Sequence, residues 1–117
     1  MKKIINIFVS CLLLSYAYSA DWPTWGGDAT RNMVSLEKGL DFDFEPGEMN
    51  DDETVDMSTT KNIKWVAKLG SQAYGNVTIA NGRVFAGTNN ESPRDSGKKG
   101  DRGVVMCFDE KNGELEW

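Results

Sequence analysis

This sequence predicts an all-β fold, and three features indicate it. Apolar and polar residues alternate from Lys61 onward, as in a strand with one buried face. Asn81-Gly82 separates two short apolar runs, which is the strongest two-residue signal for a β-hairpin. Residues 107–117 read as strand, turn and strand closed by a tryptophan, and Asn62–Trp65 ends in the same way.

The expected strands, in chain order, are Ile63–Leu69, Val77–Ala80, Arg83–Ala86, Val104–Phe108 and Glu114–Trp117. In the first strand alternate residues, among them Trp65, form one apolar face. Val104–Phe108 is apolar at every position, so we expect both of its faces to be covered. In the last strand Leu115 and Trp117 face one way, and the two glutamates face the other.

The last four of these strands form a meander with apolar inner strands and a half-polar last strand. This gradient fits one blade of a β-propeller, where neighbouring blades cover both faces and the outer strand meets water. Two Trp-ended units 52 positions apart, at Trp65 and Trp117, also favour repeats that stack on one another. Half of a β-sandwich or an open meander would contain the same strands and stays an alternative.

The amino terminus has the three parts of a secretory signal peptide. Lys2 and Lys3 form a basic start, Ile4–Leu14 is a short apolar core, and Ser15–Ala20 supplies small residues before a cleavage site. We expect residues 1–20 to be removed and the protein to be periplasmic or secreted, with no stable membrane span because the apolar run is too short. A buried helix of a cytosolic domain, or lipoprotein processing at Cys11, is the alternative.

Export would leave an acidic chain, because removing two of 13 basic residues leaves 11 against 18 acidic ones. Such a surface disfavours nucleic acid and anionic lipid as partners. Arg94–Arg102 is the one basic cluster, and we interpret it as a solvated loop with anion binding as the alternative. The surrounding stretch, Thr88–Arg102, is long for a hairpin loop, which is typical of functional loops. Cys107 would be the one remaining cysteine, so no internal disulfide is expected.

The mature chain divides into two parts. Residues 21–60 form an irregular acidic segment, in which Trp22 and Trp25 are expected to anchor on apolar surface. Residues 61–117 are expected to form the first propeller blade. The alternating segment Glu114–Trp117 has no turn or polar tail after it, so we expect the chain to be the amino-terminal piece of a longer protein.

The motif at the end of the chain resembles a known repeat. Its residues are Cys107, Asp109, Asn112, Gly113 and Trp117, and they are similar to the Ala-x-Asp-x-x-Thr-Gly-x-x-x-Trp repeat of quinoprotein, or pyrroloquinoline-quinone-like (PQQ-like), propellers. Cysteine replaces Ala and asparagine replaces Thr. The resemblance extends to two other segments: the preceding copy, 55–65, is degenerate but keeps Thr60 and Trp65, and the opening, 21–28, is similar to the start of mature quinoprotein dehydrogenases.

The resemblance implies a specific packing. In that family each Trp docks between the small residue of its own motif and the glycine of the next motif. Trp117 should therefore contact Cys107, and Trp65 should lie over the peptide of Gly113, where the missing Cβ leaves room for a ring. Asp109 is expected to accept hydrogen bonds from amides of the turn.

Few residues are candidates for chemistry. The chain contains no histidine, which removes Ser-His triads and His-based zinc sites. Asp41, Asp43 and Glu45 depart from the spacing of a calcium loop, so we expect a solvated segment and no metal site. Cys107 is expected to be a buried small residue and not a nucleophile. The catalytic and cofactor-binding residues stay unknown.

Two function classes follow from the resemblance. The first is a binding or assembly scaffold with a protein partner in the cell envelope, similar to the assembly lipoprotein of the outer-membrane β-barrel machinery. The alternative is a PQQ-dependent alcohol or sugar dehydrogenase, which would need PQQ and calcium. This chain lacks the adjacent cysteines beside which those dehydrogenases bind the quinone, and no position aligns with their Asp base or metal ligands. Dye reduction with alcohols after addition of quinone and calcium would separate the two classes.

Overall fold

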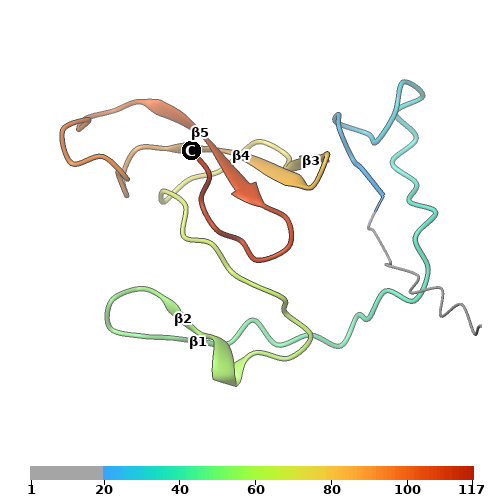
Figure 1. Cartoon of the computed structure of the whole chain (residues 1–117), viewed down its shortest axis with the longest axis horizontal. Helices are drawn as coiled ribbons and strands as arrows, with labels where there is room; N and C mark the ends of the chain where they lie inside the picture. The colour runs from blue at the N-terminus through green and yellow to red at the C-terminus, as the bar shows by residue number, and fades with distance from the viewer. Residues whose placement is uncertain (1–19) are drawn as a thin grey trace, which may run out of the picture.

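The computed structural model describes residues 20–117, so the expected signal peptide lies almost entirely outside the described residues. The fold is all-β, with two small antiparallel sheets (Figure 1). The elements are β1 (Glu48–Met49), β2 (Val55–Asp56), the 3-10 turn η1 (Met57–Thr59), β3 (Thr78–Ala80), β4 (Arg83–Asn89) and β5 (Gly103–Asp109). Strands β3, β4 and β5 form the larger sheet, and β1 pairs with β2 in the smaller one.

The hairpin predicted at Asn81-Gly82 is confirmed. Both residues have positive φ, 52° and 73°, and β3 pairs with β4 in the register that places Ile79 opposite Val84. Strand β4 continues to Asn89, beyond the expected end at Ala86, because each of its residues is paired with a residue of β5. The loop between β4 and β5 is accordingly shorter than expected and covers residues 90–102.

One face of the larger sheet carries the hydrophobic core. Val84 and Ala86 on β4 and Met106 and Phe108 on β5 are at most 7% exposed. The segment 63–69 packs on this face, with Trp65, Ala67 and Leu69 as its inward side chains.

Alternation along 63–69 was therefore predicted correctly, but the expected pairing as a strand was wrong. Within residues 20–117 this segment has no strand partner. The physical reason is that it crosses the face of the sheet, while both sheet edges are taken by other segments. Trp22 bridges Ile79 beside β3 through two backbone hydrogen bonds of 2.8 and 3.0 Å, and Leu115 bridges Phe108 beside β5.

The two amino-terminal indoles differ in their environments. Trp22 is half-buried, and a Cβ at Gly27 would lie 2.8 Å from its ring. Trp25 is 59% exposed, so the expectation that it anchors on apolar surface is wrong. The bridge to Ile79 explains the difference, because it holds the backbone of Trp22 against the sheet and ends before residue 25.

The end of the chain contains an irregularity that the alternation did not predict. Cys107 donates its N–H to the carbonyl of Trp117, 2.8 Å, and accepts the N–H of Glu116, 2.8 Å. Glu116 and Trp117 therefore both pair with the single residue Cys107 of β5. Two residues opposite one is the pattern of a β-bulge. The expectation that Leu115 and Trp117 face one way is wrong, because the bulge turns the indole toward Phe85, on the face opposite the core.

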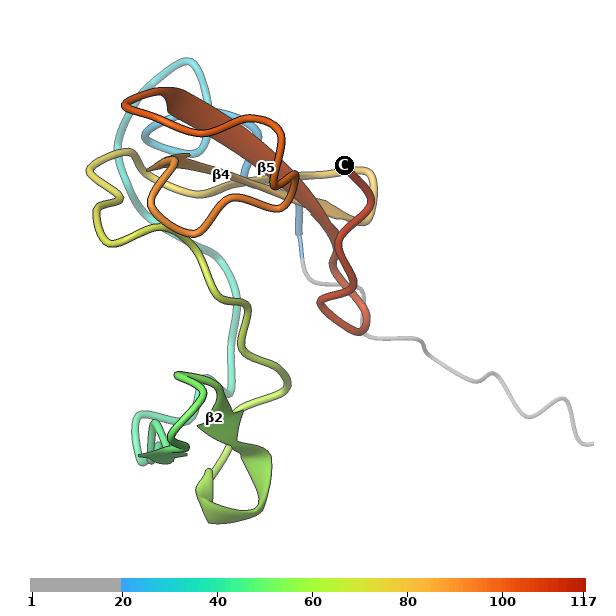
Figure 2. The same cartoon turned by 90° about the vertical axis from the view of Figure 1, so that its left-hand side faces the viewer.

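The smaller sheet was not expected, because the whole acidic segment was interpreted as irregular. Asn50 and Thr54 close a hairpin between β1 and β2 with a 2.8 Å backbone hydrogen bond, and Glu53 has a φ of 62°. Figure 2 shows this hairpin extending away from the larger sheet. The turn residues 50–53 between Met49 and Val55 were a local signal that could have identified it.

Acid should weaken the β1–β2 hairpin. Hydrogen bonds from the hydroxyl and N–H of Thr54 lower the pKa of Asp52, and those from Ser58 lower the pKa of Asp56. The stabilisation is complete above the unfolded pKa, about 3.9, and is lost as the pH falls through the lower folded values. Carbon-13 NMR titration should give both carboxyls midpoints below the unfolded value.

Two variants serve as controls for each other in that titration. Thr54→Val should raise the midpoint of Asp52 alone, and Ser58→Ala should raise that of Asp56 alone. Midpoints that shift together, or that do not shift, would contradict the assignment.

Within residues 20–117 no helix is long and apolar enough to cross a membrane.

Candidate interaction surface

The turn that follows β5 is built around Asp109. Its Oδ1 accepts the N–H of Lys111 at 2.7 Å and of Asn112 at 3.2 Å, as expected for this motif. The Asp109 carbonyl accepts the N–H of Gly113 at 2.8 Å, and the glycine has a φ of 73°. The turn is thereby fixed by its own side chain, and Gly113 presents a peptide without a Cβ.

Trp65 covers this turn. Its Nε1–H donates to the carbonyl of Glu110 at 2.9 Å, and a Cβ placed on Gly113 would lie 2.6 Å from its Cδ2. On the other side the indole contacts the ring of Phe108, with centroids 6.3 Å apart. The contact expected between Trp65 and Gly113 is present, and it joins residues 48 positions apart.

Trp117 is placed differently, although it ends a similar segment. Its backbone pairs with Cys107, but its indole is 62% exposed and touches Phe85, with ring centroids 6.2 Å apart. The expectation that the indole docks on Cys107 is therefore wrong. Trp65 has a glycine turn beneath it, whereas the bulge directs Trp117 onto the face opposite the core, where no such turn lies among the described residues.

The second face of the larger sheet is only partly covered. We call Phe85, Val105 and Trp117 the open face; Val105 is 59% exposed. Within the described residues, the expectation that Val104–Phe108 is covered on both faces is therefore wrong at Val105, because the segment 63–69 packs on the core face, whereas Cys107 on the second face is buried.

Cys107 lies on the same face and is fully buried. Its thiol is 3.6 Å from the Glu116 carboxylate, which also forms a 2.6 Å ion pair with Arg83. Burial, followed by the hydrogen bond to Glu116, raises the pKa of the thiol. A protonated buried thiol is a poor nucleophile, so the geometry supports a packing role for Cys107.

The loop between β4 and β5 borders the open face. It forms one side of a hollow of about 290 Å³, whose other side includes Val105, Leu115 and Trp117. The basic cluster on this loop is partly engaged within the chain. The Arg94 guanidinium donates to the carbonyl of Lys68, and Lys98 lies 3.6 Å from the carboxylate of Asp95.

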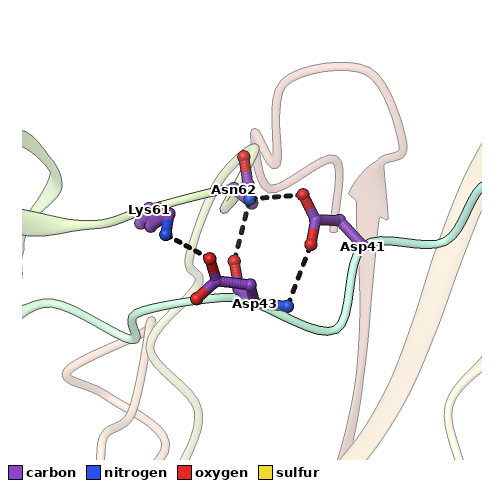
Figure 3. Close-up of polar contacts among 4 residues, drawn as sticks. All are labelled: Asp41, Asp43, Lys61 and Asn62. Carbon is purple, nitrogen blue, oxygen red and sulfur yellow. Dashed lines mark hydrogen bonds and ion pairs between the residues drawn. The ribbon is translucent and has the colours of Figure 1, made fainter.

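The acidic stretch is held by polar contacts (Figure 3). The Asn62 amide donates to the Asp41 carboxylate at 2.7 Å and to the Asp43 carbonyl at 2.8 Å, while Lys61 pairs with the Asp43 carboxylate. Glu45 is joined to Lys61 by two backbone hydrogen bonds. Among residues 20–117 no three acidic, cysteine or histidine side chains gather as a metal site would require.

Four of the six motif residues, Cys107, Asp109, Asn112 and Gly113, lie along β5 and its turn, and the indole of Trp65 packs on that turn from the segment 63–69. The backbone of Trp117 is joined to Cys107 by a hydrogen bond of 2.8 Å. Sequence reasoning missed the Glu110 carbonyl as the acceptor for the indole, and a carbonyl carries no residue-specific signal. It also missed Phe85. Alternation along the predicted hairpin places the side chains of Phe85 and Val84 on opposite faces of the same strand.

Comparison with family models, with curated proteins and with solved structures found no match to this chain.

Proposed function

We propose that this chain is a unit of a secreted or periplasmic β-propeller of the PQQ-like repeat type, which acts as a binding or assembly scaffold for a protein partner in the cell envelope. The observation that carries the proposal is the position of Trp65, whose indole lies on Gly113 and bonds to the Glu110 carbonyl. This is the packing that the resemblance to PQQ-like repeats implies. A scaffold function fits a unit whose described residues offer surfaces for packing.

The open face supports the stacking part of the proposal. One side of the sheet is closed by the segment 63–69, and the other leaves Val105 and Trp117 more than half exposed. A contiguous apolar patch on a sheet is typical of a contact surface. In a repeat architecture such a face is covered by the neighbouring unit.

We expect the secreted form of this chain to associate with itself through the open face. Trp117→Ser should reduce that association in sedimentation velocity at least severalfold, because it removes the largest exposed ring of the patch. The thermal midpoint should change little, since the indole is 62% exposed.

Trp25→Ser is the matched control, because Trp25 is 59% exposed but lies outside the open face. It should leave association unchanged. A wild-type chain that stays monomeric at high concentration, or an equal effect of the two variants, would contradict the proposed contact surface.

A further inference from the structure

The segment Ile63–Ala67 has an unusual combination of buried side chains and unpaired backbone. Its odd-numbered side chains are half-buried and its even-numbered ones are exposed, which is the pattern of a strand lying on a core. Yet within residues 20–117 no backbone N–H or C=O of these five residues has a hydrogen-bond partner in the chain. Such rows of free groups are templates for pairing with another strand.

The segment is held in place at both ends and in the middle. At one end the backbone of Lys61 pairs with Glu45, and at the other the Gly70 N–H donates to the Thr88 hydroxyl at 2.9 Å. Between them Trp65 is fixed by the Glu110 carbonyl. The backbone is therefore ordered before any partner arrives, which lowers the entropy cost of binding.

A cleft lies beside this segment. It has a volume of about 640 Å³, and its walls include Val66 and Ala67 on one side and Met49, Val55 and Met57 of the β1–β2 region on the other. Methionines adapt to side chains of different shapes. A strand placed along 63–67 could thus direct an apolar side chain into the cleft.

We propose that Ile63–Ala67 is a site of β-strand addition, and that its occupant is an extended segment of a protein partner in which acidic and apolar residues alternate. Another extended backbone matches this segment, because alternate residues of an extended chain present their free N–H and C=O groups toward the same edge. The outward side chains set the chemistry. Lys64 is exposed and its amine lies 3.3 Å from the Glu110 carbonyl, Val66 is 48% exposed, and Lys68 forms a 2.6 Å ion pair with Glu53.

A second copy of the same segment fits this site poorly. Antiparallel pairing centred on Val66 would place Lys64 of one copy opposite Lys68 of the other, and like charges directly opposite each other are destabilising. A carboxylate of the partner opposite Lys64 would instead pair with its ammonium group, whereas Lys68 is already paired with Glu53.

The test uses the full chain at low micromolar concentration and hydrogen exchange followed by mass spectrometry. The probe is a ten-residue peptide of alternating Val and Glu at millimolar concentration. Two matched peptides are the controls: one has Lys in place of Glu, and the other is N-methylated at alternate amides. We expect the Val-Glu peptide alone to slow exchange at least tenfold at the alternate amides of 63–67 that face the added strand, with β4 unchanged.

Other outcomes would overturn the proposal. These are equal protection by the N-methylated peptide, protection at a different edge, no protection, or protection that rises with protein concentration in the absence of peptide. Val66→Pro, which removes an N–H, should weaken the effect more than Val66→Ala. If the proline variant does not fold, the peptide comparison still decides. Residues 63–67 are not part of the open face. A negative result in this test therefore does not bear on the proposed stacking surface.

Discussion

Replacing Gly113 with alanine is expected to destabilise the fold by about 3 kcal/mol. Two effects combine at this position. Its φ of 73° is unfavourable for a residue with a side chain, and the new Cβ would lie 2.6 Å from Cδ2 of the Trp65 indole. The indole cannot move away without losing its hydrogen bond to the Glu110 carbonyl. Urea denaturation followed by tryptophan fluorescence measures the change.

Gly82→Ala separates the two effects. Gly82 has the same φ of 73°, but a Cβ there would meet no atom within 4 Å. This substitution should lower the free energy of unfolding by about 1 to 2 kcal/mol, because its one cost is the unfavourable backbone conformation. The difference between the two variants is then the contact with Trp65. Equal losses would show that the indole does not depend on the missing Cβ.

Trp65→Ala is expected to cost about 3 to 4 kcal/mol, because it removes the side chain that links the core to the turn after β5. The indole contacts Phe108 and is part of the apolar layer over Val84 and Met106. Trp65→Phe should cost less, about 1 to 2 kcal/mol, since a ring remains but the Glu110 carbonyl loses its donor.

Trp25→Ala is the control for these variants, since that indole is 59% exposed and should change stability by less than about 0.5 kcal/mol. Thermal and urea denaturation of the four chains should order them as wild type, then Trp25→Ala, then Trp65→Phe, then Trp65→Ala. If Trp65→Phe were as stable as the wild type, the hydrogen bond to Glu110 would have no role in the docking.

The two tryptophans that end similar segments show how one motif can have two outcomes. Trp65 lies over a turn of the same chain, and Trp117 lies exposed on the open face. This asymmetry fits a unit that has accepted one neighbouring segment and still offers a surface for another. Under the proposed scaffold function, the open face is where the next unit would pack.

Local patterns predicted the parts of the fold that depend on a few adjacent residues. Asn81-Gly82 determined the hairpin because both positions require positive φ, and Asp109 determined the turn through its own carboxylate. Alternation along 63–69 identified Trp65 as an inward residue for the same reason, since successive side chains of an extended chain point to opposite sides.

By itself, the sequence determined the all-β class, the β3–β4 hairpin and, through the motif, the contact between Trp65 and Gly113. Only the tertiary structure decided that 63–69 crosses the sheet face instead of joining its edge, that a bulge turns Trp117 toward Phe85, and that the acidic stretch forms the β1–β2 hairpin. The physical reason is competition for partners. Trp22 and Leu115 occupy the sheet edges, and which segment reaches an edge depends on the whole chain and not on the pattern of any one segment.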